Sequence, residues 1–192
     1  MPNTYLHTAI LSSFVDGPNI DGVLGEILGH MPESEERPRW DRVKRFLPST
    51  GKPVFAMNGE HFTEKAYSFF RAMTYMGYDF KAVPPTERSS TNEDPVDNYI
   101  KDRLDAALTE QVAGRPQHIT LLSHDHFHAV TLAQIVDAGG SIALIGFPEW
   151  LAPDLLALEG DRCEVLDLER DVGAFSYRLP RPYLPRGGRR AV

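Results

Sequence analysis

Short apolar runs alternate along the chain with longer segments in which apolar residues recur at the spacing of one helix face. The apolar runs have the length of strands and predict six of them, at Ala9–Val15, Pro53–Met57, Tyr78–Val83, Ile119–Leu122, Ser141–Gly146 and Cys163–Leu168. The fourth run is apolar throughout, as is typical of the buried centre of a parallel sheet. This alternation predicts an α/β domain with a mostly parallel central sheet.

The segments between the strands predict the helices. Trp40, Val43 and Leu47 fall on one helical face, and Gly77 follows a long periodic segment as an expected C-cap. We expect helices over Ile20–Leu28, residues 40–47, Phe62–Met76, Val96–Val112, His126–Ala138 and Pro153–Glu159. Four aromatic residues of the chain are expected to serve as core or surface cover and not to stack on nucleic-acid bases: Trp40, Phe69, Phe70 and Trp150.

The end of the chain has a different composition. Residues 176–192 hold three prolines, a glycine pair and five arginines without an acidic residue. We therefore predict one domain over residues 1–175 and a basic tail over 176–192. The tail is interpreted as solvated and disordered, and the competing interpretation is an arm that grips RNA.

Net charge, cysteine content and the lack of long apolar runs make some classes of protein less favoured for this chain. A net charge of −7 does not favour a broad electrostatic binder of nucleic acid, because phosphate contacts come from Lys and Arg. It does not exclude a nuclease, because a bound cation reverses the local field of a carboxylate cluster. A single cysteine, Cys163, precludes an internal disulfide and suits a reducing compartment. With no apolar run of about 20 residues and no basic segment typical of a signal peptide at the start, we expect a cytoplasmic protein without a membrane partner.

Carboxylates follow two of the predicted strands. Asp16 and Asp125 would lie beyond the carboxyl ends of the first and fourth strands, where ligands bind in parallel α/β sheets. Asp97 begins the helix that precedes the fourth strand. Taken singly, Asp16 suits a turn, Asp97 a helix dipole and Asp125 an N-cap. Together they would place three oxygen ligands at one edge of the sheet, as a Mg²⁺ or Mn²⁺ site requires.

Four segments resemble the motifs of one family, the NYN domains of the PIN-like nuclease superfamily. Phe14–Asn19 is similar to the opening F-[IV]-D-G-x-N motif, and Asp94–Asp97 to a K-G-V-D segment before a long helix. Leu121–Asp125 resembles the S-[GH]-D strand end, and Ile142–Phe147 matches a strand that ends in G-F. The resemblance extends over about residues 9–168.

The resemblance implies a three-layer PIN-like (Rossmannoid) fold and metal-dependent hydrolysis of RNA. Asp16, Asp97 and Asp125 would be the catalytic metal ligands. Asn19 would position the first aspartate or a substrate phosphate, and Ser123 would lie in the same shell. Lys101, one turn beyond Asp97, is the basic residue best placed to contact a phosphate. RNA is the expected partner, and a homodimer is left open.

The chain departs from the family pattern after Asp125. The second acid of the family's D-G-D-F motif is missing, because the run here is Asp125-His126-Phe127-His128. Either His126 or His128 would replace it, and we assign His126 as the fourth ligand, or the site has three acids. An imidazole ligand shifts the preferred metal from Mg²⁺ towards Mn²⁺ or Zn²⁺. The missing acid also leaves open a weakened nuclease fold that binds RNA or a protein without cutting.

Two other hydrolase classes share part of the pattern. His124, His126 and His128 resemble the H-x-H-x-D-H turn of metallo-β-lactamase-like zinc hydrolases, but that family needs a further histidine downstream and none follows His128. Haloacid-dehalogenase-like phosphatases also have an aspartate at the end of the first strand. They need a second one two residues later, where this chain has Pro18. Both classes rank below the nuclease.

Overall fold

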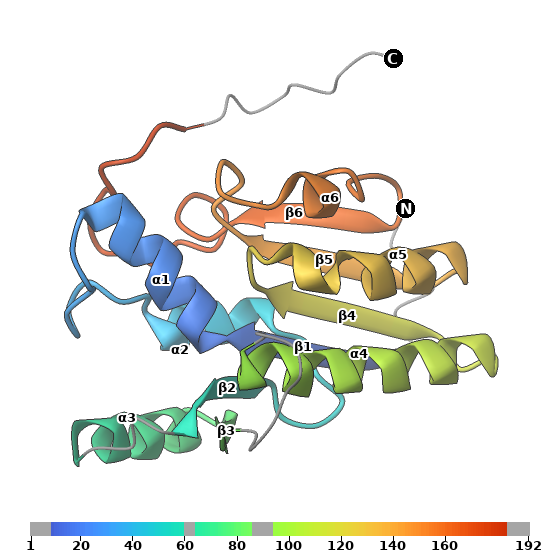
Figure 1. The fold of residues 1–192 in the computed structure, drawn as a ribbon, viewed down its shortest axis with the longest axis horizontal. Helices are drawn as coiled ribbons and strands as arrows, with labels where there is room; N and C mark the ends of the chain where they lie inside the picture. Colours follow the sequence, from blue (N-terminus) through green and yellow to red (C-terminus); the bar gives the residue numbers. More distant parts are fainter. Residues whose placement is uncertain (1–8, 60–63, 86–93, 184–192) are drawn as a thin grey trace.

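Six parallel strands form one central sheet in the computed structural model, which describes residues 9–59, 64–85 and 94–183 (Figure 1). The order across the sheet is β3-β2-β1-β4-β5-β6. The strands are β1 (Ile10–Asp16), β2 (Val54–Asn58), β3 (Asp79–Val83), β4 (Gln117–Leu122), β5 (Ser141–Gly146) and β6 (Cys163–Asp167). The predicted α/β class and all six predicted strands are confirmed, with shifts of one or two residues at their ends.

Helices cover both faces of this sheet. One face carries α1 (Gly17–Leu28), α2 (Trp40–Val43) with the 3₁₀ turn η2 (Lys44–Phe46), and α3 (Glu64–Tyr75). The other carries α4 (Pro95–Val112), α5 (Ala129–Asp137) and α6 (Pro153–Leu156), and the 3₁₀ turn η4 (His126–His128) leads into α5. The result is a three-layer Rossmann-like fold.

Successive residues of the central strands enter opposite cores, which explains their continuous apolar character. Phe14 and Leu121 are register partners and both pack under α4 and α5. Their neighbours Val15 and Leu122 pack under α1 and α2 on the other face. Strands buried on both faces cannot show polar alternation, so a run such as that of β4 is apolar throughout.

The strand order reverses between β1 and β4. The chain moves outward from β1 through β2 to β3, then returns by α4 to place β4 on the other side of β1. Such a switch point leaves a crevice beyond the carboxyl ends of the two central strands. Asp16 is the last residue of β1, and Ser123, His124 and Asp125 directly follow β4. The fold therefore brings the predicted carboxylate edge to the place where open α/β sheets bind ligands.

Local sequence features explain the helix ends. Asp16 and Asp94 are the N-caps of α1 and α4, and each is followed by a proline in the first turn. Gly29 ends α1 in the left-handed conformation, with φ 79°. The predicted helix over 126–138 begins as the 3₁₀ turn η4 and becomes α-helical only at Ala129. The start of the predicted helix over 62–76 and most of the predicted loop over 84–92 lie outside the described residues.

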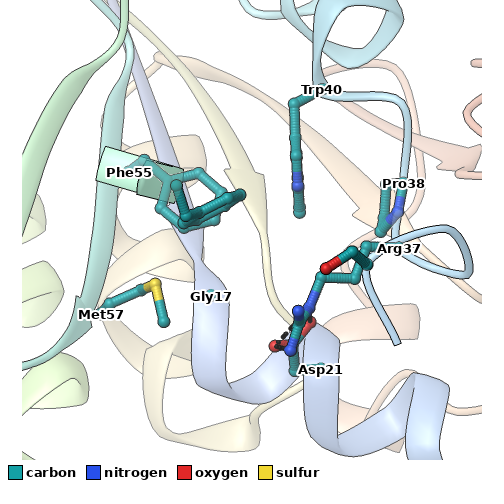
Figure 2. Close-up of a pocket in the computed structure, with 9 residues that line it drawn as sticks. Gly17, Asp21, Arg37, Pro38, Trp40, Phe55 and Met57 are labelled. Atoms are coloured by element: carbon teal, nitrogen blue, oxygen red, sulfur yellow. Dashed lines mark hydrogen bonds and ion pairs between the residues drawn. The ribbon is translucent and has the colours of Figure 1, made fainter. Parts of the chain in front are cut away.

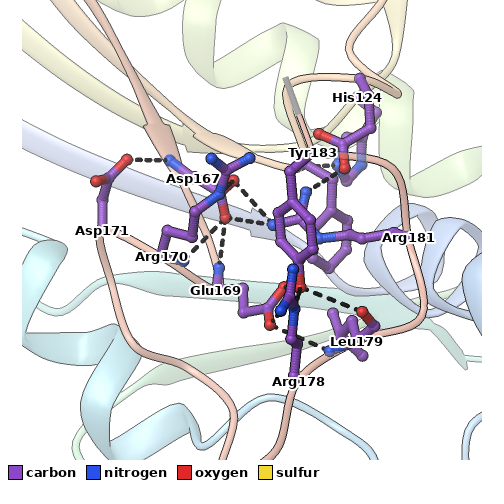
Figure 3. Close-up of polar contacts among 11 residues, drawn as sticks. His124, Asp167, Glu169, Arg170, Asp171, Arg178, Leu179, Arg181 and Tyr183 are labelled. Carbon is purple, nitrogen blue, oxygen red and sulfur yellow. Dashed lines mark hydrogen bonds and ion pairs between the residues drawn. The ribbon is translucent and has the colours of Figure 1, made fainter. Parts of the chain in front are cut away.

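The chain beyond residue 175 packs against the domain as far as the structure describes it, to Tyr183. Arg181 is 6% exposed and bonds to the carboxylates of Asp167 and Glu169, which Figure 3 shows, and also to that of Glu149. Its guanidinium also lies 4.9 Å from the Phe147 ring centroid. The prediction of a solvated, disordered tail is therefore wrong for residues 176–183, because a buried arginine with three acidic partners holds this segment. Residues 184–192 lie outside the described residues.

Within the described part of the chain, no helix combines the length and the apolar character needed to cross a membrane.

Candidate metal centre

Asp16 is the first member of the site and is held from two sides. Its Oδ1 accepts a hydrogen bond from the Asn19 backbone N–H at 3.1 Å, which caps α1. Its Oδ2 accepts one from the Ser123 hydroxyl at 2.9 Å, which links β1 to the end of β4. The next residue, Gly17, has no side chain, which lets the backbone pass close to β2. A Cβ at this position would lie 2.8 Å from the Ala56 carbonyl oxygen. The carboxylate is thereby oriented within the crevice and is only 1% exposed.

The environment of Asp16 disfavours its negative charge. Burial raises the pKa of Asp16 to about 7, against the lowering effect of the hydrogen bonds from Asn19 and Ser123. The carboxylates of Asp94 and Asp125 raise the pKa further. A buried carboxylate near two others is stabilised in its charged form by a cation.

Asp97 enters the site from the first turn of α4. The start of this helix is fixed by Asp94, whose Oδ1 accepts from the Val96 N–H at 2.8 Å and whose Oδ2 accepts from Asn58 Nδ2 at 2.9 Å. Asn58 is the last residue of β2, so α4 begins against the sheet edge. Val96 and Ile100 are fully buried beneath the helix. Asp97, with a side chain 15% exposed, is thus directed at the same edge as Asp16.

His128 completes the group from the end of η4. Its side chain is fully buried, and neither ring nitrogen has a hydrogen-bond partner among the residues that the structure describes. Its Nε2 lies 3.9 Å from Oδ1 of Asp97. Burial lowers the pKa of His128 to about 4, so the ring is neutral at physiological pH. A neutral imidazole with unsatisfied nitrogens in a polar crevice is suited to bind a metal, because buried polar atoms normally have partners.

Asp16, Asp97 and His128 each offer one ligand atom, and these atoms lie within 4.8 Å of one another. Ligand atoms of a first-row cation or Mg²⁺ lie roughly 3 Å apart when adjacent and roughly 4.2 Å apart when opposite, because each bond is about 2.1 Å long. Side-chain rotations that draw the three atoms together would therefore close the group around one ion. Two carboxylates and an imidazole form a mixed oxygen and nitrogen donor set.

A second set of bonds braces the loop after β4. Asn19 Oδ1 accepts hydrogen bonds from the backbone N–H and the ring Nδ1 of His124, at 2.8 and 2.9 Å. The other ring nitrogen, Nε2, accepts the Phe147 N–H at 2.8 Å, which fixes the proton on Nδ1. Burial, with a smaller effect of Arg181, lowers the pKa of His124 to about 3. His124 is thus a neutral link between the start of α1 and the ends of β4 and β5.

The predicted ligands Asp125 and His126 are not in this group. The Asp125 carboxylate caps η4 by accepting the Phe127 N–H at 2.8 Å, as the N-cap interpretation expects. Its Oδ1 also lies 3.1 Å from Nδ1 of His126, whose side chain is 78% exposed. Of the two histidines that could replace the family's second acid, the structure directs His128 and not His126 at the aspartates. Asp125 still acts on the site through its charge, which raises the pKa of both Asp16 and His128.

The residues predicted to bind substrate have other contacts. Ser123 is fully buried, and its hydroxyl donates to Asp16 and accepts the Asp125 N–H at 3.2 Å. It and Asn19 therefore position the ligands. Lys101 bonds to Asp105 at 2.5 Å and is near enough to His128 to lower the pKa of that ring. Its contact with a phosphate stays a prediction.

The three histidines of the alternative zinc site do not come together among the described residues. Both ring nitrogens of His124 are used by Asn19 and Phe147, and His126 is exposed beside Asp125. Among the described residues, only His128 joins a group that could hold a metal.

Comparisons with known proteins support the fold alone. No model of a protein family and no curated protein matches the sequence. A crystal structure of a Vibrio parahaemolyticus protein of unknown function is similar, with a TM-score of 0.64 and 14% sequence identity. The match covers 89% of this chain and 98% of the Vibrio protein. At this identity the similarity indicates a shared architecture over nearly the whole of both chains.

Proposed function

We propose that the protein is a metal-dependent nuclease that hydrolyses phosphodiester bonds of RNA with a divalent cation held by Asp16, Asp97 and His128. The observation that supports this most is the buried, unsatisfied imidazole of His128 beside two aspartates at the switch point of the sheet. A purely structural histidine at this position would leave two buried polar atoms without compensation, which costs free energy.

The chemistry follows from the ligands and their supports. A cation bound here would lower the pKa of a water molecule and neutralise charge on the phosphoryl oxygens. The residues of the chain would do the positioning: Ser123 and the Asn19 N–H orient the Asp16 carboxylate, and the N-cap at Asp94 fixes the helix that carries Asp97. The mechanism requires no nucleophilic side chain.

The donor set favours Mn²⁺ ahead of Mg²⁺. Carboxylates suit both ions, but an imidazole ligand suits the softer one. We therefore expect Mn²⁺ to support the higher activity and Mg²⁺ a lower one.

Cleavage of labelled RNA by the full chain tests the proposal. We expect cleavage with Mn²⁺, none after EDTA treatment, and a loss of at least 100-fold in Asp16→Asn. Asp102→Asn is the matched control, because this exposed aspartate lies on the same helix as Asp97 and outside the group. Cleavage that survives both EDTA and Asp16→Asn would refute the proposal. RNA binding without cleavage under any divalent ion would indicate the binding module instead.

A further inference from the structure

A pocket of about 330 Å³ lies on the α1 and α2 face of the sheet (Figure 2). Gly17, which is bonded covalently to Asp16, lines it. The other wall residues used below are Asp21 of α1, Arg37, Trp40, Phe55 and Phe69. The nuclease proposal assigns no role to this pocket.

Aromatic rings form much of the wall. Trp40 and Phe55 meet edge to face with centroids 4.8 Å apart, and Phe55 and Phe69 do so at 5.5 Å. Figure 2 shows the indole of Trp40 extending into the pocket between Phe55 on one side and the Arg37–Asp21 pair on the other. Trp40 is 6% exposed, and its Nε1 has no hydrogen-bond partner among the described residues. A buried indole N–H normally donates a hydrogen bond to an acceptor. The lack of one here indicates that a ligand in the pocket supplies the acceptor.

Arg37 and Asp21 provide the polar side of the pocket. Arg37 Nε lies 3.1 and 3.0 Å from the two oxygens of Asp21, and its Nη2 lies 3.0 Å from Oδ2. This pair carries no net charge. A pocket of this kind does not favour a phosphate or a cation, but it offers hydrogen-bond donors and an acceptor to the edge of a neutral ring.

Together these features describe a site for a flat, uncharged ligand with a polar edge. We propose that the pocket binds a base of the RNA substrate, which stacks against the aromatic wall while its edge contacts the Trp40 indole N–H and the Arg37–Asp21 pair. This inference rests on the proposed nuclease function. If a base binds in this pocket, cleavage is selective for the base next to the phosphate that is cut at the metal site. Unstacked bases of single-stranded RNA are commonly recognised by aromatic stacking with hydrogen bonds to their edges.

The indole resonance of Trp40 gives a direct test. The chain has two tryptophans, so Trp150→Phe leaves Trp40 as the single indole N–H in a ¹⁵N spectrum. The full chain is titrated with each of the four ribonucleoside 5′-monophosphates and with ribose 5-phosphate. We expect a saturable shift of this resonance with nucleotides, at least a fivefold spread of Kd among the four bases, and weaker binding of ribose 5-phosphate.

Matched variants assign the recognition. Phe69→Ala should weaken nucleotide binding roughly tenfold, because it removes part of the stacking wall. Arg37→Ala should abolish the differences among the bases. Arg39→Ala should preserve them, because Arg39 is half exposed and pairs with Asp41 outside the pocket. The inference is overturned if the four nucleotides bind within twofold of one another, if ribose 5-phosphate binds as tightly, or if Arg37→Ala keeps the discrimination.

The same titration in Asp16→Asn separates this inference from the nuclease proposal. Base-dependent shifts should persist in this variant, because Asp16 does not line the pocket. If they persist while the natural protein cuts no RNA with any divalent ion, the base pocket is retained and the nuclease is rejected. RNA cleavage that depends on Asp16 without base-dependent shifts would retain the nuclease and reject the base pocket.

Discussion

Nε2 of His128 lies 3.9 Å from Oδ1 of Asp97, in a crevice where the imidazole has no hydrogen bond within the described structure. The two residues are on different elements, since Asp97 lies in the first turn of α4 and His128 at the end of η4. Their approach beside Asp16 is the geometric basis of the proposed metal site. It also makes the ligand set testable without an activity assay.

Replacement of His128 by alanine should abolish stabilisation by Mn²⁺. A cation at about 100 times its Kd stabilises the folded protein by about 2.7 kcal/mol, which raises the melting temperature of a domain of this size by roughly 5–10 °C. The variant should lose this rise because it loses a ligand. The measurement is thermal unfolding with Mn²⁺ and with EDTA, each variant being compared with its own metal-free form.

His126→Ala is the control for this experiment. His126 is two residues away, exposed and outside the group, so its removal should preserve the full metal-dependent rise. If His126→Ala loses the rise and His128→Ala keeps it, the ligand set derived from the structure is wrong.

Replacement of Asp16 by asparagine should stabilise the metal-free protein at alkaline pH. In the unfolded chain Asp16 ionises near its ordinary pKa of 3.8, whereas burial and the nearby carboxylates keep it protonated in the folded state up to about pH 7. The folded state is therefore penalised increasingly as pH rises from 4 to 7, and the penalty is constant above that. The full effect is at most about 4 kcal/mol.

The asparagine variant should thus equal the natural protein in stability near pH 4 and exceed it at pH 8, in EDTA. Its side-chain oxygen still accepts the Asn19 N–H, so the cap of α1 remains. With Mn²⁺ present the order at pH 8 should reverse, because only the natural protein binds the ion. Chemical unfolding at both pH values measures these differences. An asparagine variant that is less stable than the natural protein at every pH in EDTA would show that the buried charge is not costly.

The sequence predicts the sheet well and the ligand set only in part. Six apolar runs became six parallel strands, because burial on both faces leaves a strong local signal. Asp16 and Asp97 could be placed from a strand end and a helix start. The choice between His126 and His128 could not, because it depends on η4 being a 3₁₀ turn that directs His128 inward and on Asp125 capping that turn.

The C-terminal segment shows a different limit. Prolines and arginines around Arg181 predict disorder from local composition, yet its partners Glu149, Asp167 and Glu169 lie 12 to 32 residues earlier in the chain. Contacts between Arg181 and three carboxylates from earlier segments leave no pattern in the sequence near Arg181 that would predict an ordered segment. The pocket lined by Trp40 and Phe69 could not be predicted from the sequence either. Both residues were expected to be core or surface cover, and Trp40 packs in the core while one side of its ring lines the cavity.

Arg181→Met should destabilise the protein by about 3–5 kcal/mol, because it removes the buried guanidinium that Glu149, Asp167 and Glu169 share. Arg178→Met is the control. Arg178 contacts the same Tyr183 ring from an exposed position and bonds to none of these three carboxylates. Its loss should change stability by less than about 1 kcal/mol. Equal effects of the two substitutions in urea unfolding would contradict the pairing of Arg181 with these carboxylates as the main anchor of this segment.

Acid should destabilise the natural protein more than Arg181→Met. Burial acts to raise the pKa of Asp167, but the hydrogen bond and charge of Arg181, with the backbone N–H groups of Arg170 and Glu169, bring it below its ordinary value. The natural protein therefore loses this stabilisation as pH falls below about 4. Without Arg181, only the Arg170 side chain and the backbone N–H groups of Arg170 and Glu169 still favour the charged carboxylate against burial, so the variant should lose less stability over the same fall in pH. Unfolding curves between pH 3 and pH 7 measure both slopes.

Gly146→Ala should weaken both the fold and the metal site. A Cβ at Gly146 would lie 2.7 Å from Nε2 of His124, and this ring is held by Asn19 on one side and by the Phe147 N–H on the other. The ring can move only by breaking one of these bonds, so we expect a loss of about 1–3 kcal/mol. Since the Asn19 N–H also orients Asp16, Mn²⁺ binding measured by calorimetry should weaken severalfold.

Gly22→Ala separates this steric effect from the general effect of replacing a glycine. Gly22 lies within α1, and a Cβ there would meet nothing within 4 Å. The substitution should stabilise the protein by about 0.5–1 kcal/mol, because alanine loses less backbone entropy in a helix. It should leave the Kd for Mn²⁺ unchanged. If Gly146→Ala is as harmless as Gly22→Ala, the contact between His124 and β5 does not brace the loop that carries Ser123. Asp16 would then be positioned by the Asn19 N–H and the Ser123 hydroxyl without support from His124.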